Sequence, residues 1–308
     1  MRNGYSPPGQ KSTKKDPGCP TAAFEKSLAD PDSDGILYAE SSTMHSFKTV
    51  LPVITLLYAI SFHVQAAGRY SVIHVPESYT AQKPVPLLLV LHGYSLDADT
   101  IEEFSGLSEL SEKEGYIALY PDGTPDAEGK KGWNAGPGFD ERFRGADDDS
   151  CIVSLIHETQ KKYSIDPSRI YAVGYSNGGF MAYSLSQRHP GLFAGIGAVA
   201  ASISIPLEKL TAPVSVIHIH GLADPIVRFK GTGSFRSVSS LIDRFRELNG
   251  CTKEPAISRN GAVENEIWKG EKGDIALYTI RGLGHDWPAN EINTGETLWN
   301  FLKTQTSK

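Results

Sequence analysis

Three residues that stand far apart in the chain are the most able to do chemistry: a serine, an aspartate and a histidine. The serine is the centre of Gly174-Tyr175-Ser176-Asn177-Gly178, a G-x-S-x-G pattern between an apolar run and a segment of helical periodicity. In this pattern the serine occupies a tight strand-to-helix turn, and the glycines avoid collisions with the adjacent backbone. Ser176 is therefore predicted to be a nucleophile, the alternative being a glycine-rich turn with an inert serine.

A serine hydroxyl needs a base to take its proton and an acid to orient that base. Both are expected in loops that follow later strands, with the acid before the histidine. Asp224 follows an apolar run that ends at Ile219, and His285 follows one that ends at Ile280. We predict that Asp224 orients His285, because the adjacent Asp286 would reach the ring Nδ1 with difficulty.

The competing histidines have structural explanations instead. Only His285 lies late in the chain in a glycine-flanked loop after a strand, which is the expected place for the base. The others lie in, end or border predicted strands, helices and turns: His74, His157, His189, His218 and His220.

The tetrahedral intermediate of acyl transfer carries an oxyanion that needs two backbone N–H donors. One is expected directly after the nucleophile, at Asn177, where the helix dipole adds to the effect. The second is expected in the loop after Leu91-His92-Gly93, at Tyr94. We interpret His92 itself as a structural residue that holds this loop.

The elements that must position these residues alternate between short apolar runs and helical patterns. Strands are predicted at 86–91, 116–120, 169–173, 196–200, 214–219 and 275–280, and helices at 99–114, 148–163, 177–188, 237–248 and 296–303. This alternation predicts a three-layer α/β domain, with a mostly parallel central sheet and helices on both faces. Residues 69–75 alternate in polarity and are expected to form an antiparallel edge strand.

The first 66 residues are expected to lie outside this domain. Residues 1–43 are rich in Pro, Gly, Ser, Asp and Lys and are predicted to be disordered, with Met44 the true start of translation. Residues 44–66 have the three regions of a signal peptide, with cleavage after Ala66. An uncleaved anchor or a hydrophobic helix is the alternative. Residues 67–308 are then a single catalytic domain of a secreted or periplasmic protein, without stable membrane insertion.

Composition excludes other classes of function. The formal net charge of −6 is unsuited to nucleic acid, which attracts basic surfaces. Three cysteines without CxxC spacing support neither a zinc site nor a thioredoxin-like motif. Whether Cys151 and Cys251 form a disulfide stays open.

Taken together, these residues resemble the secreted α/β-hydrolase esterases grouped as polyhydroxybutyrate depolymerases, feruloyl esterases and acetylxylan esterases. The resemblance covers residues 69–304 and rests on ordered blocks: LeuHisGly at 91–93, TyrProAspGly at 120–123, GlyTrpAsn at 132–134, AspAsp at 147–148, GlyTyrSerAsnGlyGly at 174–179, AsnGlyCys at 249–251 and TrpPro at 287–288. It implies an α/β-hydrolase fold and a carboxylic ester hydrolase with Ser176, Asp224 and His285 as its triad. It implies no metal and no organic cofactor.

Aromatic and amide side chains near these blocks are expected to line the substrate cleft: Trp133, Asn134 and Trp287. A buried tryptophan is more often packing than recognition, which is the alternative. The acyl group stays open between acetyl, feruloyl and 3-hydroxybutyryl, on a plant cell-wall polysaccharide or a polyester oligomer. Two further alternatives are a serine peptidase of the same fold and a non-catalytic hydrolase-like binding module.

Overall fold

The structure is a computed structural model that describes residues 61–66, by their backbone alone, and residues 69–307. The segment predicted to be disordered, 1–43, lies outside the described residues, as do residues 44–60 of the predicted signal peptide. Within the described part of the chain, every helix is too short or too polar to cross a membrane.

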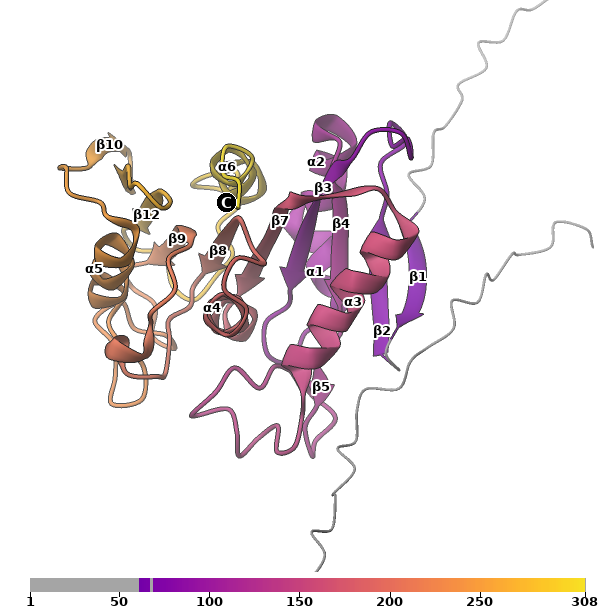
Figure 1. Cartoon of the computed structure of the whole chain (residues 1–308). Coiled ribbons are helices and arrows are strands. Elements are labelled where there is room, and N and C mark those ends of the chain that lie inside the picture. Colours follow the sequence, from indigo (N-terminus) through magenta and orange to yellow (C-terminus); the bar gives the residue numbers. More distant parts are fainter. Residues whose placement is uncertain (1–60, 67–68, 308) are drawn as a thin grey trace, which may run out of the picture.

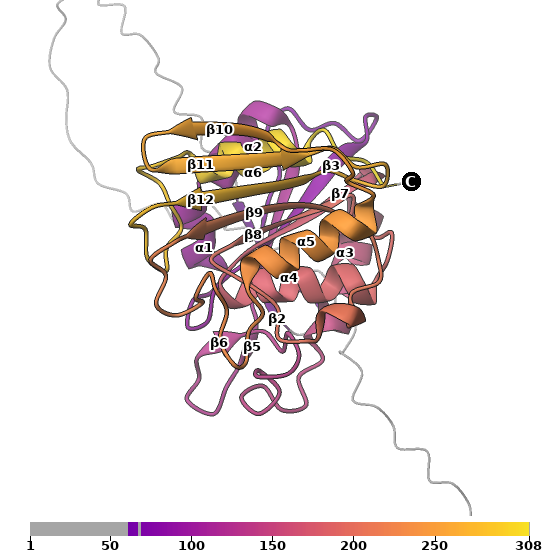
Figure 2. The ribbon, with the colours of Figure 1, turned by 90° about the vertical axis from the view of Figure 1, so that its left-hand side faces the viewer.

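A ten-stranded sheet runs through the molecule in the order β1-β2-β4-β3-β7-β8-β9-β12-β11-β10 (Figures 1 and 2). Strands β4, β3, β7, β8, β9 and β12 are parallel, and antiparallel strands flank them on both sides. The strands of this sheet are β1 Ser61–Ala66, β2 Arg69–His74, β3 Val85–Leu91, β4 Ile117–Pro121, β7 Ile165–Tyr175, β8 Gly195–Val199, β9 Ser215–Gly221, β10 Ala256–Asn260, β11 Val263–Trp268 and β12 Ile275–Ile280. A separate small sheet pairs β5 Thr124–Pro125 with β6 Lys131–Gly132.

Helices cover both faces of the large sheet (Figures 1 and 2). The side chains of β3 show why: Leu87, Leu89 and Leu91 belong to one buried apolar cluster, and Leu88 and Val90 to another. The first cluster is completed by α3 Asp148–Lys162, α4 Asn177–Arg188 and α5 Val238–Asn249, and the second by α1 Ala98–Ser105, α2 Leu107–Glu114 and α6 Thr294–Leu302. A short 3-10 helix, Leu207–Lys209, completes the helical elements. The predicted three-layer arrangement is thereby confirmed.

Two element predictions were wrong in detail. The helix expected over 99–114 is two helices, because Gly106 adopts a left-handed conformation with φ 68° that ends α1 and begins α2. The antiparallel hairpin of β10 and β11 was not predicted, and every residue of β10 is exposed. An exposed strand has no apolar run by which its sequence would indicate it.

The N-terminal strands bear on the predicted processing site. Strand β2 pairs antiparallel with β4, as expected for residues 69–75, but β1 pairs with its other side. Strand β2 is therefore not the edge of the described sheet, contrary to the prediction. Cleavage after Ala66 would remove β1 and make β2 the edge strand.

Candidate active site

The strand-to-helix turn at Ser176 has the strained geometry that the sequence predicts. Ser176 joins β7 to α4 with φ 50° and ψ −119°, a conformation that L-residues rarely adopt. A Cβ on Gly174 would lie 2.2 Å from the backbone of Gly178, and one on Gly178 would lie 2.1 Å from the carbonyl oxygen of Leu91. Both glycines are thus sterically required, and the turn aims the serine side chain out of the sheet edge.

The structure brings the three predicted chemical residues together. Ser176 Oγ lies 2.8 Å from His285 Nε2, and His285 Nδ1 lies 2.8 Å from Asp224 Oδ2. Because an ionised carboxylate only accepts, Nδ1 carries the proton of a neutral ring, and Nε2 accepts from the serine hydroxyl. The Asp224 side chain is wholly buried, whereas His285 retains 16% exposure. This is the arrangement that a base needs to take a proton from serine.

Asp224 is held by its own loop after β9. Its Oδ1 accepts hydrogen bonds from the backbone N–H groups of Ile226 (2.8 Å) and Val227 (2.9 Å), which leaves Oδ2 aimed at His285. Asp286, the rejected alternative, instead accepts from the N–H of its neighbour Trp287 at 2.8 Å. The choice of Asp224 over Asp286 is therefore supported by the geometry.

Tyr175 supports the histidine loop, a role that the sequence did not reveal. Its hydroxyl donates to the carbonyl oxygen of His285 at 3.1 Å, and the two rings lie 5.5 Å apart between centroids. Burial raises the pKa of Tyr175 to about 12, and the nearby carboxylates of Asp286 and Asp224 contribute smaller increases. The phenol therefore remains a donor. The only signal in the sequence was its place directly before the nucleophile.

The two predicted oxyanion donors lie at the expected turns. Asn177 is the first residue of α4, and Tyr94 lies in the turn after β3. Within residues 69–307, neither backbone N–H takes part in a hydrogen bond, so both are available to a ligand. The side chain of Tyr94 points to other partners: its hydroxyl donates to Asp126 at 2.7 Å, and Arg142 lies over its ring at 4.6 Å.

The side chain of Asn177 clamps Trp133 in the segment between β4 and α3. Asn177 Oδ1 accepts from the Trp133 N–H at 2.6 Å, and Asn177 Nδ2 donates to the Trp133 carbonyl at 3.1 Å. Trp133 is 0% exposed, and its indole N–H donates to the carbonyl oxygen of His92 at 2.8 Å. The prediction that Trp133 lines the substrate cleft is therefore wrong, because this side chain fills the space beneath the site.

His92 has the structural role that was assigned to it. Its Nε2 accepts from the Gly123 N–H at 2.8 Å, so Nδ1 donates to the Gly93 carbonyl at 2.8 Å. Burial lowers the pKa of His92, which keeps the ring neutral as these two bonds require. The ring thereby joins the loop after β3 to the loop after β4.

Asn134 is positioned by a buried carboxylate. Its backbone N–H donates to Asp148 Oδ2 at 2.7 Å, while Asp148 also accepts from the Thr124 hydroxyl at 2.7 Å and forms an ion pair with Arg69. The Asn134 side chain is half-buried, and its Oδ1 has no hydrogen-bond partner within the described residues. A contact between Asn134 and substrate stays a prediction.

Trp287 offers little surface to a substrate, because it is only 7% exposed. Its ring packs edge to face against Phe104 (5.9 Å) and Tyr175 (6.4 Å). Among the described residues, exposed large apolar side chains include Phe104, which packs against Trp287 and Tyr175, and Leu222 and Ile226 in the loop of Asp224; they are 37%, 45% and 62% exposed. Leu222 and Ile226 stand two residues on either side of Asp224, but Leu222 lines a separate cavity with Val263, Thr279 and Arg281. No motif in the sequence indicates any of the three.

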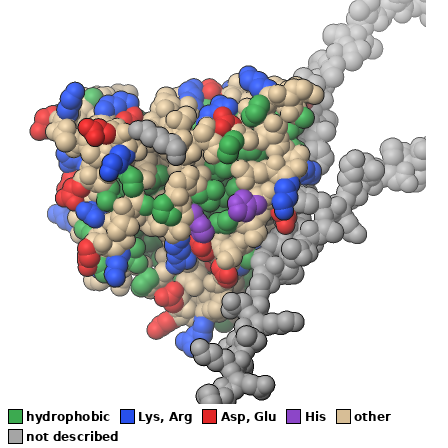
Figure 3. Space-filling view, viewed as in Figure 1, with side chains coloured by type: hydrophobic (Ala, Val, Ile, Leu, Met, Phe, Trp, Pro, Cys, Tyr) green, Lys and Arg blue, Asp and Glu red, His purple; other side chains and the backbone are tan. Residues whose placement is uncertain are grey.

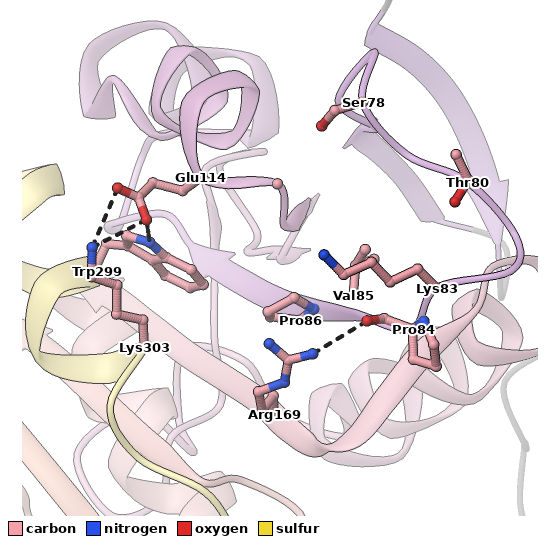
Figure 4. A pocket seen from close by; sticks show the side chains of 11 residues that line it. Ser78, Thr80, Lys83, Pro84, Val85, Pro86, Glu114, Arg169, Trp299 and Lys303 are labelled. Atoms are coloured by element: carbon pink, nitrogen blue, oxygen red, sulfur yellow. Dashed lines mark hydrogen bonds and ion pairs between the residues drawn. The ribbon is translucent and has the colours of Figure 1, made fainter.

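A cavity of about 360 Å³ opens at the other end of the sheet (Figure 4). It is lined by Lys83, Arg169, Glu114, Trp299 and Lys303, with Glu114 accepting from the Trp299 indole at 2.9 Å and from Lys303 at 3.1 Å. Because it lies where the parallel strands begin, it is separate from the triad, which lies where they end.

The described residues contain the side chains from which a metal site or a disulfide could form. No group of three or more His, Cys, Asp or Glu side chains in the described part of the chain is placed to hold a metal ion. Cys151 and Cys251 are not joined to each other by a disulfide. Acidic and basic side chains are interspersed on the face shown in Figure 3.

Comparisons with known proteins identify the family of the chain. The profile of the esterase PHB depolymerase family matches residues 70–262. NocK from Nocardia uniformis subsp. tsuyamanensis is 34% identical over 258 residues, with 70% of this chain and 74% of NocK covered. Feruloyl esterase B from Piromyces equi is 28% identical over 257 residues, with 76% of this chain covered but only 45% of that longer protein.

A solved structure extends the comparison to the fold. Acetyl xylan esterase from Aspergillus awamori superposes with a TM-score of 0.64 at 16% identity, covering 79% of this chain and 99% of that one. This likeness confirms the predicted α/β-hydrolase fold. The family profile spans well over half of the sequence, and the chain therefore belongs to the esterase PHB depolymerase family.

Proposed function

We propose that this protein is a serine carboxylic ester hydrolase that works through an acyl-enzyme. The observation that carries the proposal is the continuous hydrogen-bonded line from Ser176 Oγ through His285 to Asp224, with both distances 2.8 Å. It starts at a strained turn directly before α4. Membership of an esterase family supports the same reaction.

Acylation begins when His285 Nε2 takes the proton of the Ser176 hydroxyl and Oγ attacks the ester carbonyl carbon. The N–H groups of Tyr94 and Asn177 donate to the oxyanion that forms. The protonated ring of His285 then gives its proton to the leaving alcohol, and an ester between Ser176 and the acyl group remains.

Deacylation repeats these steps with water. His285 Nε2 takes a proton from water, the hydroxide attacks the acyl carbon, and the same oxyanion donors act again. Collapse of the intermediate releases the carboxylic acid and returns the proton to Ser176 Oγ. Asp224 stays ionised throughout and stabilises the positive ring of His285.

The proposed substrates are feruloyl, acetyl or short hydroxyalkanoate esters, either linked to a polysaccharide or oligomeric. The names of similar proteins, feruloyl esterase B and acetyl xylan esterase, support the first two acyl groups. The exposed side chain of Phe104, which packs against Tyr175 and Trp287 beside the triad, suits an apolar acyl chain or ring.

We also propose that the protein is exported, on the strength of the signal-peptide pattern at 44–66. N-terminal sequencing of the exported protein should give Ala67 as the first residue. A first residue upstream of Met44 would contradict both the processing site and the start at Met44.

Replacement of the nucleophile tests the proposed reaction. Ser176→Ala should reduce turnover of p-nitrophenyl acetate by about 10⁴-fold or more, because no other group forms the acyl-enzyme. Its circular dichroism spectrum should match that of the parent. Ser78→Ala, which changes an exposed serine at the other end of the sheet, should retain full turnover.

The same experiment separates the alternatives. Activity on a matched amide that equals activity on the ester would indicate a serine peptidase. Undiminished turnover in Ser176→Ala would contradict the proposed mechanism. Absence of turnover in the parent on feruloyl, acetyl and 3-hydroxybutyryl esters would indicate a binding module.

A further inference from the structure

A buried chain of polar side chains leads from the middle of α4 to the triad acid. The Tyr183 hydroxyl lies 2.8 Å from His218 Nδ1, and His218 Nε2 lies 3.0 Å from His220 Nδ1. His220 Nε2 lies 2.7 Å from the Val227 carbonyl oxygen and 3.5 Å from Asp224 Oδ2. The three ring-bearing residues are 0%, 0% and 1% exposed. The proposed mechanism uses none of them.

The fold explains why these side chains meet. His218 and His220 are two residues apart on β9, so they project from the same face of the sheet. Their rings lie parallel, 10° apart with centroids 5.2 Å from one another. Helix α4 covers the same face (Figure 2), and its Tyr183 ring stacks beside His218 with centroids 6.1 Å apart.

Only one arrangement of protons satisfies every bond in the chain. The Val227 carbonyl can only accept, so His220 Nε2 carries a proton. Burial lowers the pKa of His220 and of His218, so each ring is neutral with a single proton. His220 Nδ1 is therefore an acceptor, His218 Nε2 donates to it, and His218 Nδ1 accepts from Tyr183.

The tyrosine hydroxyl must then be the donor at the far end of the chain. Burial raises the pKa of Tyr183 far above its ordinary value, so its proton is always present. That proton points at His218 Nδ1. If Nδ1 rather than Nε2 of His218 carried the ring proton, two hydrogens would meet between the hydroxyl and the ring unless the hydroxyl turned away. The same reversal would leave two lone pairs facing each other between His218 and His220.

The end of the chain meets the loop that carries the triad acid. The Val227 N–H donates to Asp224 Oδ1, and the Val227 carbonyl accepts from His220 Nε2. Both backbone groups of Val227 are therefore held by hydrogen bonds. The His220 N–H also faces Asp224 Oδ2, the oxygen that accepts from His285. The reversed tautomer of His220 would present a lone pair to both the carbonyl and the carboxylate, which repels them.

We propose that Tyr183, His218 and His220 are positioning residues for the hydrolytic reaction, and that their ordered hydrogen bonds hold Asp224 aimed at His285. The proposal rests on the proposed role of Asp224 as the triad acid. No proton moves along the chain during turnover. Its effect is geometric, because a misplaced orienting acid weakens the base that must act in both acylation and deacylation.

Tyr183→Phe tests the chain at its far end while keeping the ring. We expect kcat for p-nitrophenyl acetate to fall about tenfold with KM within about twofold, because binding is untouched and the base is misaligned. Tyr171→Phe is the matched control: its hydroxyl is also buried and donates to one carbonyl, that of Gln305, at 2.8 Å. That variant should lose comparable stability and retain kcat within about twofold.

The amplitude of the acylation burst separates positioning from a loss of folded protein. In Tyr183→Phe each molecule should still give one burst equivalent of p-nitrophenol, released more slowly. A lower amplitude with an unchanged rate, or the same kcat in Tyr183→Phe and Tyr171→Phe, would overturn the proposal. His220→Gln, which keeps an N–H near the position of Nε2, should retain more activity than His220→Leu, and equal losses would also overturn it.

Nitrogen-15 NMR of the histidine rings tests the chain without any turnover. In the parent, His218 and His220 should both be neutral with the proton on Nε2. In Tyr183→Phe only the shift of His218 Nδ1 should change, because that atom loses its hydrogen bond while His220 Nδ1 still accepts from His218 Nε2. A proton on Nδ1 of either ring in the parent would overturn the proposal. An inactive parent with the expected tautomers would instead contradict the proposed function and remove the catalytic role of the chain.

Discussion

At the residue scale, Asn177 serves the candidate active site with both its backbone and its side chain. Its backbone N–H begins α4 and faces the proposed oxyanion, while its side chain satisfies both the N–H and the carbonyl of Trp133. The second contact fixes the segment between β4 and α3 against the nucleophile turn. The alignment of the turn thus depends on the side chain of Asn177 as well as on its backbone.

Asn177→Ala should therefore lower both stability and activity. The buried N–H of Trp133 loses its partner, which costs about 1–3 kcal/mol of unfolding free energy, while the Trp133 carbonyl keeps a second donor in the Ala135 N–H at 3.0 Å. Asn249→Ala is the control, because Asn249 makes the same double contact with Val214, at 3.2 and 2.7 Å, and also donates to the Gly273 carbonyl at 3.1 Å. Urea unfolding should show a loss in Asn249→Ala at least as large as in Asn177→Ala, and only Asn177→Ala should lose kcat. An equal loss of kcat in both would contradict this assignment.

A site residue can be predicted from the sequence when its chemistry allows it only a few positions in the fold. Ser176, Asp224 and His285 could be predicted, because a nucleophile turn and two loops after strands leave few positions for them. Trp133 was misassigned, since residue type does not reveal that its ring is wholly buried. Tyr175 was missed for a related reason: its bond to the His285 carbonyl joins segments 110 positions apart.

At the scale of elements, a buried carboxylate helps to hold the segment 122–147, beside the contacts made by Asn177 and His92. Asp148 joins Arg69 of β2, Thr124 of β5 and the backbone of Asn134. Its side chain is 0% exposed, so removal of the carboxylate leaves these partners without their acceptor.

Asp148→Ala should cost about 3–5 kcal/mol of unfolding free energy, the range for breaking a buried ion pair from one side. The neighbouring Asp147 is a built-in control, because its side chain only caps α3 by accepting from the Ser150 N–H at 3.0 Å. Asp147→Ala should cost about 1 kcal/mol. Equilibrium unfolding in urea measures both, and equal losses would show that Asp148 acts merely as part of the helix cap.

The elements themselves were predictable where apolar patterns indicated them. Helix α4 and strand β12 have the bounds expected from the sequence, Asn177–Arg188 and Ile275–Ile280. The β10 and β11 hairpin was not, since the cross-strand pairs that hold it include an exposed ion pair between Arg259 and Glu264 rather than an apolar stripe. Pairing of this kind becomes visible only when the strand register is known.

At the scale of the whole molecule, buried histidines make stability depend on pH. Burial lowers the pKa of His92, His218 and His220 below the ordinary value of 6.5. Between the lowered folded values and 6.5, the unfolded chain binds protons that the folded protein does not. Stability is therefore complete above pH 6.5 and decreases as the pH falls below it.

Urea unfolding between pH 7.5 and pH 5 measures this effect. The unfolding free energy should fall below pH 6.5 by up to about 1.4 kcal/mol per pH unit for each of these histidines. His157→Gln, at an exposed position of α3, should leave the slope unchanged. A free energy that is constant or rises from pH 6.5 to pH 5 would contradict the assignment of neutral buried rings.

Direct trapping of the nucleophile tests the central claim of a serine acyl-transfer mechanism. The protein is treated with a fluorophosphonate, and its intact mass and peptide masses are measured. One adduct per molecule on Ser176, formed in step with the loss of ester turnover and absent from Ser176→Ala, is the predicted result. An adduct on another residue that abolishes turnover, or full turnover after Ser176 has been modified, would contradict the mechanism.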